Sequence, residues 1–255
     1  MALRALLWDV DGTLAETERD GHRVAFNRAF AGAELPVCWD QDSYARWLGI
    51  SGGHERIQAQ LALLEGTPPE PQRVADLQTA KQHHYQQLLA GGALQLRPGV
   101  ADLLQEAHRA GVVQAIVTTS GRQAVQGLVD HLLGPLNQAF AFWVCGEDVR
   151  HKKPDPEAYG LAYERLSREG HVGAADELLV IEDSAHGLSA ARSAGLPCLL
   201  TLSHYGGSDR QLDWGTARAV VSELGPAAQV LQGPPCHQGQ ITLSYLQALL
   251  RPSRP

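Results

Sequence analysis

The stretch LLWDVDGTLAETE (residues 6–18) places two aspartates, Asp9 and Asp11, one residue apart directly after an apolar run. Residues 5–8 predict a short buried strand, because the run is apolar and the turn formers Asp11 and Gly12 follow it. Side chains two positions apart on an extended chain point the same way. Two carboxylates placed like this share a site only if a cation separates them or a proton lies between them. The stretch therefore predicts a strand end with a chemical role.

The composition is that of a globular α/β protein. The 255 residues are enough for one large α/β domain, or for a domain with a smaller companion, and 44% of them are hydrophobic. The formal net charge of -7 argues against nucleic acid or an anionic membrane as the main partner. An anionic substrate is compatible with this charge if a bound cation and local basic residues reverse the field.

The cysteines and the N-terminus indicate a cytoplasmic protein. The four cysteines lie far apart and form no C-x-x-C pair, which predicts reduced thiols in the core. They are Cys38, Cys145, Cys198 and Cys236. The first strand begins without a signal-peptide pattern, and no apolar run approaches the roughly 18 residues that a membrane helix needs. We expect a monomer without membrane or nucleic-acid partners.

Strand-like and helix-like patterns alternate along most of the chain. Five further apolar runs predict buried strands, at residues 112–117, 139–144, 178–181, 198–202 and 219–221. Helical patterns bounded by Pro or Gly lie between them, at residues 98–110, 156–168 and 185–194. Strands that alternate with helices of about 10 to 15 residues predict an α/β fold with a doubly wound parallel sheet.

Residues 16–92 interrupt this alternation, because they contain no convincing strand. Four helical patterns fill the segment, at residues 22–30, 42–49, 54–64 and 73–90. We expect a helical cap inserted after the first strand, with hinges after Leu14 and at residues 91–92. The core would then comprise residues 1–15 and 93–224.

The last segment, residues 225–255, is expected to be a loop followed by a short helix. Residues 225–240 are rich in Pro, Gly and Gln, which is typical of a loop. Residues 241–250 (ITLSYLQALL) predict a short helix packed on the core.

Polar side chains follow several predicted strands, at the edge where open α/β sheets bind ligands. They are Asp9 and Asp11 after the first strand, Thr118, Thr119 and Ser120 after the second, Glu182 and Asp183 after the fourth, and Lys153 between the third and fourth. Carboxylates suit a hard Mg²⁺ ion, whereas hydroxyls, backbone N–H groups and a lysine suit a phosphoryl group. The set predicts phosphoryl transfer.

The absence of a Cys or Ser nucleophile motif leaves an ionised aspartate beside Mg²⁺ as the attacking group. Its neighbour can then pass a proton to the leaving oxygen and take one from water. Taken singly, these motifs have ordinary interpretations: a solvated turn, a helix N-cap, an exposed lysine pair, and a glutamate that holds loops together.

The motifs DVDGT, VTTS, KKPDP and IEDS resemble those of the haloacid dehalogenase-like phosphatases in order and spacing, over residues 1–224. The resemblance implies Asp9 as a nucleophile that forms an aspartyl-phosphate, and Asp11 as general acid/base. It implies Thr118 and Lys153 as stabilisers of the phosphate and the nucleophile. The implied Mg²⁺ ligands are Asp9, the Asp11 carbonyl, Glu182 and Asp183. The position of the insert matches the helical cap of β-phosphoglucomutase and phosphoglycolate phosphatase.

Three stretches in and after the insert resemble the CbbY-like subgroup, which removes the 1-phosphate of xylulose-1,5-bisphosphate and is associated with the Calvin cycle. They are LAETERDGHRVAFNRAF, WDQDSYARWLGISGGHERI and LRPGVADLL. The resemblance implies a sugar-phosphate substrate. The candidate substrate-binding residues are Glu18, Tyr44, Gly53, Arg56, Lys81, Thr118, Thr119, Ser120 and Lys153.

Judged singly, the candidate cap residues are interpreted as ordinary surface or packing groups, and so is His22. On the resemblance, we expect closure to bring Arg56 and Lys81 to the far phosphate of a bisphosphate and Glu18 to the sugar hydroxyls. His54 stands where the subgroup usually has lysine. This weakens the case for a second phosphate there, because histidine is mostly neutral at pH 7.

The main hypothesis is a Mg²⁺-dependent sugar-phosphate phosphatase. Alternatives are a phosphomutase on the same machinery, a phosphatase for another small phosphorylated metabolite, and a non-catalytic sugar-phosphate-binding protein. Dehalogenation is disfavoured, because the acids serve a Mg²⁺-phosphate site. A non-catalytic relative would be expected to lack an acid or the lysine, and this chain keeps both.

Overall fold

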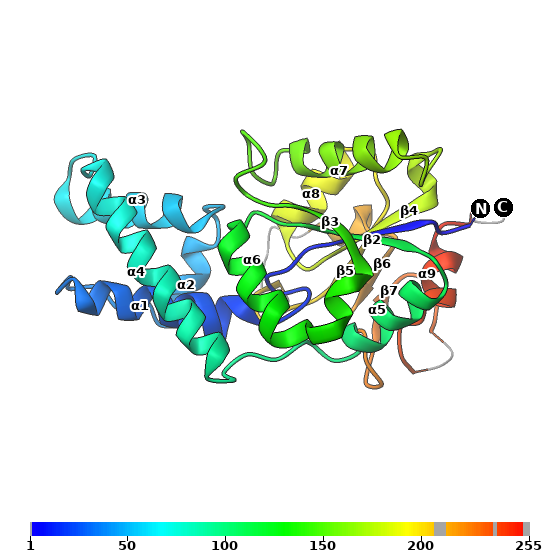
Figure 1. Ribbon diagram of the computed structural model, residues 1–255, viewed down its shortest axis with the longest axis horizontal. Coiled ribbons are helices and arrows are strands. Elements are labelled where there is room, and N and C mark those ends of the chain that lie inside the picture. Colours follow the sequence, from blue (N-terminus) through cyan, green and yellow to red (C-terminus); the bar gives the residue numbers. More distant parts are fainter. Residues whose placement is uncertain (1, 207–212, 237–238, 252–255) are drawn as a thin grey trace.

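A central sheet organises the computed structural model, which describes residues 2–206, 213–236 and 239–251 (Figure 1). Its seven strands lie in the order β3-β2-β1-β4-β5-β6-β7. Their bounds are β1 Ala5–Trp8, β2 Val113–Val117, β3 Phe140–Val144, β4 Leu178–Glu182, β5 Cys198–Thr201, β6 Ala219–Val221 and β7 Val230–Gln232. All neighbouring strands are parallel except β6 and β7. The predicted doubly wound α/β fold is confirmed.

Helices cover both faces of the sheet, and alternate residues of β1 are buried on opposite faces. Leu6 and Trp8 belong to a cluster with α5, α6 and α9, whereas Ala5 and Leu7 belong to one with α7 and α8. These helices are α5 Val100–Arg109, α6 Arg122–Leu128, α7 Glu157–Arg168, α8 Ala185–Ser193 and α9 Leu243–Leu249. A sheet covered on both faces needs near-continuous apolar strands, so the strands were predictable from apolar runs.

Residues 16–92 form a helical unit without strands, at one end of the molecule (Figure 1). A π-helical turn at Glu18–His22 leads into α1 Arg23–Gly32, α2 Gln41–Trp47, α3 Gly53–Glu65 and α4 Pro71–Ala90. These elements enclose an apolar cluster of their own, built around Phe26, Phe30, Trp39 and Ile57. We refer to residues 16–92 as the cap.

The buried Arg97 joins the cap hinge to the ends of the core strands. The two chain segments that connect cap and core pair at Ala15 and Leu96. Arg97 is 7% exposed, and its guanidinium donates hydrogen bonds to four backbone carbonyls. These carbonyls belong to Gly12, Thr201, Leu202 and Ser222. The hinge is therefore tied to the carboxyl ends of β5 and β6.

Some local predictions were wrong or incomplete. Strand β7 lies inside residues 225–240, which were expected to be a loop; it is a short, partly exposed edge strand with no apolar run. No helix was named for the region of α6. The helix expected in 241–250 is present as α9, where Leu243 N–H donates to Glu106 Oε2 at 2.9 Å. Residues 237–238 and 252–255 of the predicted C-terminal segment lie outside the described residues.

The cysteines are only partly as predicted. All four are free, but only Cys145 and Cys198 are buried, whereas Cys38 is exposed and Cys236 is half-buried. Among the described residues, no helix is both long and apolar enough to cross a membrane.

We expect Arg97→Met to destabilise the fold. The four carbonyls would lose their donor inside the protein, so the free energy of unfolding should fall by about 2–4 kcal/mol. Urea unfolding measures this. Arg109→Met, on the exposed end of α5, is the matched control and should stay within about 0.5 kcal/mol of the parent. Equally small effects of both variants would show that the four hydrogen bonds of Arg97 do not stabilise the fold.

Candidate active site

Three carboxylates converge at the carboxyl ends of β1 and β4. Asp9, Glu182 and Asp183 are 7%, 1% and 6% exposed, and their ligand oxygens all lie within 4.8 Å of one another. They meet because β1 and β4 are neighbours, with Trp8 opposite Ile181. Burial, and then the charge of Glu182, raise the pKa of both Asp9 and Asp183 well above the usual range.

Lys153 places one positive charge inside this cluster. Its Nζ donates to Asp9 Oδ1 at 2.8 Å, to Glu182 Oε1 at 2.7 Å and to the Val117 carbonyl at 2.8 Å. Burial alone would lower the pKa of Lys153, but the carboxylates of Asp9 and Glu182 raise it above its ordinary value. The ammonium is therefore charged and holds the two acids together.

Glu182 is hydrogen-bonded on both oxygens. Oε1 also accepts from the Tyr159 hydroxyl at 2.8 Å, and Oε2 accepts from the N–H groups of Asp183 at 3.0 Å and Ser184 at 3.3 Å. A β-carbon at Gly187 would lie 1.8 Å from this carboxylate, so only glycine lets α8 begin so close to it. Glu182 thus sits behind the site and does not line the cavity.

Asp11 is held from two sides, by the cap and by the core. Its Oδ1 accepts from the Thr17 hydroxyl and lies 2.9 Å from His22 Nε2, and its Oδ2 accepts from the Ser120 hydroxyl. Burial alone would raise the pKa of Asp11, but His22 and then the Ser120 and Thr17 hydrogen bonds hold it well below its usual range. Asp11 is therefore ionised.

His22 connects Asp11 to Lys81 of the cap. Lys81 Nζ lies 2.9 Å from His22 Nδ1, and the His22 ring stacks on Tyr85 with centroids 4.3 Å apart. Burial lowers the pKa of Lys81 to about 8. The interpretation of His22 as an ordinary cap residue was wrong. Its position four residues after Glu18 could have identified His22 as a candidate site residue, because this spacing puts both side chains on about the same helical face.

The cap contributes a second buried ion pair. Arg56 Nη1 donates to Glu18 Oε1 at 3.1 Å and to the Tyr44 hydroxyl at 2.9 Å, and the Tyr44 hydroxyl donates to Glu18. Arg56 is 7% exposed. In this arrangement Arg56 is engaged by Glu18, so its contact with a far phosphate stays a prediction.

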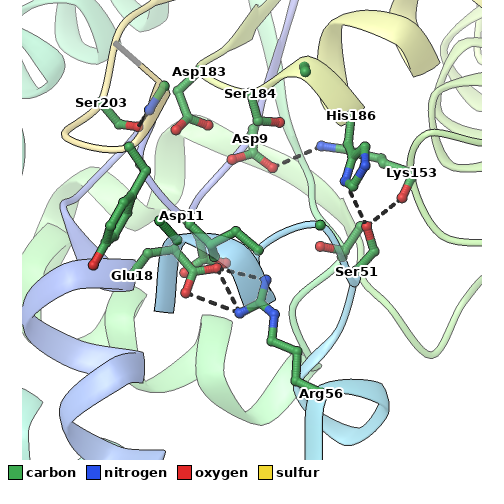
Figure 2. Close-up of a pocket in the computed structure, with 18 of the residues that line it drawn as sticks. Asp9, Asp11, Glu18, Ser51, Arg56, Lys153, Asp183, Ser184, His186 and Ser203 are labelled. Carbon is green, nitrogen blue, oxygen red and sulfur yellow. Dashed lines mark hydrogen bonds and ion pairs between the residues drawn. The ribbon is translucent and has the colours of Figure 1, made fainter. Parts of the chain in front are cut away.

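A cavity of about 450 Å³ lies between these cap and core groups (Figure 2). Figure 2 shows Asp9 and Asp183 on the side of the core and Glu18 and Arg56 facing them from the cap. Cap and core touch at its rim, where Ser51 Oγ donates to the Lys153 carbonyl at 2.6 Å and lies 3.3 Å from His186 Nδ1. The cavity size is that of a small-molecule site.

The remaining candidate residues differ in their position. A smaller cavity of about 40 Å³ lies beside this one. Thr118 is 1% exposed and lines neither cavity, and its hydroxyl accepts from the Ser120 N–H at 3.0 Å. Thr119 lines both cavities, and Gly53 lines the smaller one. His54 is exposed and lines neither.

The acid cluster suits a divalent cation. Lys153 pairs with Asp9 and Glu182, so three ionised carboxylates would leave negative charge in excess, and burial followed by the charge of Glu182 raises the pKa of Asp9 and Asp183. A hard cation would offset this charge with the oxygen ligands that it prefers.

Comparisons with known proteins agree with this chemistry. The family model of the haloacid dehalogenase-like hydrolases matches residues 3–195. Protein CbbY of Cereibacter sphaeroides is 39% identical over 218 residues, which are 83% of this chain and 92% of that protein. A mutant of CbbY from Rhodobacter sphaeroides, solved in complex with xylulose-(1,5)bisphosphate, superimposes with a TM-score of 0.77 at 36% identity, over 87% of this chain and 94% of that one. Phosphoglycolate phosphatase of Salmonella typhi is 28% identical, over 76% of this chain and 79% of that protein.

We expect Asp183→Asn to stabilise the metal-free protein at neutral pH. Because the folded-state pKa of Asp183 is raised, the folded state binds more protons than the unfolded state between the two pKa values, and stability falls there as pH rises. Removing the charge should raise Tm in EDTA at about pH 7 by roughly 2–4 °C, the shift for about 1 kcal/mol. The difference in Tm between Asp183→Asn and the parent should disappear towards about pH 4, where the carboxyl group becomes protonated in both states.

If the acid cluster binds Mg²⁺ in the folded parent through the Asp183 carboxylate, Mg²⁺ should reverse this order of stability. Asp76→Asn, on the exposed face of α4, is the control and should change neither the pH profile nor the response to Mg²⁺. A variant that is less stable than the parent in EDTA at every pH would contradict the excess of negative charge.

Proposed function

The chain belongs to the haloacid dehalogenase-like hydrolase family, and from this premise we propose that it is a Mg²⁺-dependent phosphatase whose substrate is xylulose-1,5-bisphosphate. The likeness to CbbY in complex with that compound supports the substrate. One observation carries the chemistry: Asp9, held by Lys153, faces the same cavity as the ionised Asp11.

Asp9, Asp183 and the Asp11 carbonyl would hold the Mg²⁺ ion. When bound, the ion supplies positive charge next to the oxygens of the transferring phosphoryl group. Glu182 is occupied by Lys153, Tyr159 and the start of α8, so we assign it a supporting role behind the ligands.

Asp9 is the proposed nucleophile. Lys153 binds Asp9 Oδ1, and no described residue donates to Oδ2, so Oδ2 is free to attack. The Oδ2–phosphorus bond forms as the bond from phosphorus to the sugar oxygen breaks. Water then attacks phosphorus, which releases phosphate and restores the Asp9 carboxylate.

Asp11 is the proposed proton carrier. Its ionised state suits the second half of the reaction, in which it takes a proton from the attacking water. The proton that it gains can be given to the sugar oxygen in the next cycle. Thr17, His22 and Ser120 fix the direction of its carboxylate.

The cap is proposed to select the sugar. Its contacts with the core through Ser51 enclose the cavity and keep out water other than the attacking one. Glu18 faces the cavity and is held there by Arg56 and Tyr44, which suits the recognition of sugar hydroxyls.

Phosphate release from xylulose-1,5-bisphosphate tests the function. We expect Mg²⁺-dependent release by the parent and none by Asp9→Asn, because an amide is not a nucleophile. Asp11→Asn should keep metal binding and lose about 10²–10⁴ in rate.

Acid quenching during turnover should trap one phosphoryl group on Asp9. Asp76→Asn should behave as the parent. Near-normal release by Asp9→Asn would rule out the assigned roles, and conservation of total ester phosphate would indicate a phosphomutase.

We expect His22→Ala to slow turnover by about 10²-fold through kcat, because Asp11 loses the group that orients it. The pKa of Asp11, now held low by His22, should rise towards its ordinary value. The acidic limb of the pH–rate profile should therefore move to higher pH. The control is His83→Ala, exposed on α4. An unchanged profile for His22→Ala would show that His22 only packs against Tyr85.

A further inference from the structure

A second cavity, of about 40 Å³, lies beside the main one and is lined by both cap and core. The two cavities share the walls formed by Glu18, Arg56 and Thr119. Helix α4 adds three polar side chains to the smaller cavity, Gln78, Lys81 and Gln82. Positions separated by three and four residues lie on one face of a helix, so one face of α4 forms this wall.

Two of these side chains carry buried polar atoms without a partner. Gln78 Oε1 and Gln82 Nε2 are buried, and neither has a hydrogen-bond partner among the residues that the structure describes. Gln82 is 9% exposed and Lys81 is 4% exposed. Leaving a buried amide atom unpaired is costly, so an occupant of the cavity is expected to bind there.

The first residue of α3, Gly53, lies close to the Gln78 side chain. A β-carbon at Gly53 would lie 3.3 Å from Gln78 Oε1 and 3.4 Å from the Phe26 ring. Glycine at this position therefore leaves room for the amide beside the backbone. Gly53 thus has a packing role toward α4 that its sequence motif does not specify.

We infer that Gln78 and Gln82, with Lys81, form a subsite that binds a hydroxyl group of the substrate's sugar. A hydroxyl both donates and accepts, so it can satisfy an amide oxygen and an amide nitrogen at once. A phosphate dianion only accepts. It also needs more room, because a water-sized group takes about 10–15 Å³ and the cavity therefore holds about three such groups. The subsite rests on the proposed function and adds residues that discriminate between substrates.

Substrate discrimination tests the subsite. The kcat/KM ratio of xylulose-1,5-bisphosphate to phosphoglycolate, which carries no hydroxyl group on its carbon chain, is measured for the parent and for Gln82→Met. Methionine keeps the length of the side chain and removes its hydrogen bonds. The ratio should fall about 10- to 100-fold, the loss expected for a buried hydrogen bond to the substrate.

Two further variants complete the test. Gln87→Met, exposed on the same helix, should leave the ratio unchanged. Gly53→Ala, which places a methyl group 3.3 Å from Gln78 Oε1, should lower the ratio in the same direction but by less than Gln82→Met. An unchanged ratio for both Gln82→Met and Gly53→Ala would overturn the subsite and show that the cavity holds water only. Equal losses of kcat/KM on both substrates would overturn the subsite and show that these residues only maintain the structure of the cap. A parent that hydrolyses neither compound would remove the proposed function, and the subsite with it.

Discussion

The buried ammonium of Lys153 is the interaction on which the rest of the site depends. The pairing of β1 with β4 brings Asp9 and Glu182 together inside the protein. Buried carboxylates so close repel each other strongly unless a positive charge lies between them. Lys153 supplies that charge from the loop before α7 and is anchored on the Val117 carbonyl. The strand order and the chemistry of the site are therefore parts of one arrangement.

The two aspartates of the first motif have opposite electrostatic environments, although one residue separates them. Asp9 faces the other buried acids and its pKa is raised, whereas Asp11 accepts three hydrogen bonds and its pKa is lowered. Pairs of titratable groups whose pKa values are pushed apart are suited to different roles. Asp9, the proposed nucleophile, needs positive charge beside it to ionise, which a cation would provide, whereas Asp11, the proposed proton carrier, is ionised by its protein contacts.

The position of the cap and the geometry of the candidate site depend on the same residues. Asp11 is bound by His22 of the cap and by Ser120 of the core, and Ser51 of the cap contacts the backbone of Lys153. Arg97 ties the hinge to the loop after β1 through the Gly12 carbonyl. Movement of the cap would therefore change the contacts of Asp11 as well as access to the cavity.

The sequence by itself determined the sheet, the insert and the acids at the strand ends. Continuous apolar runs mark strands that are buried on both faces, and motifs that follow such strands must meet at one edge. Strand β7 was not predicted, because an exposed edge strand needs no apolar run. Only the tertiary structure decided that His22 lies between Asp11 and Lys81, that Glu18 engages Arg56, and that one amide atom each of Gln78 and Gln82 is buried without a partner among the described residues. These contacts join helices up to 59 residues apart, and no local periodicity encodes how the cap helices dock on one another.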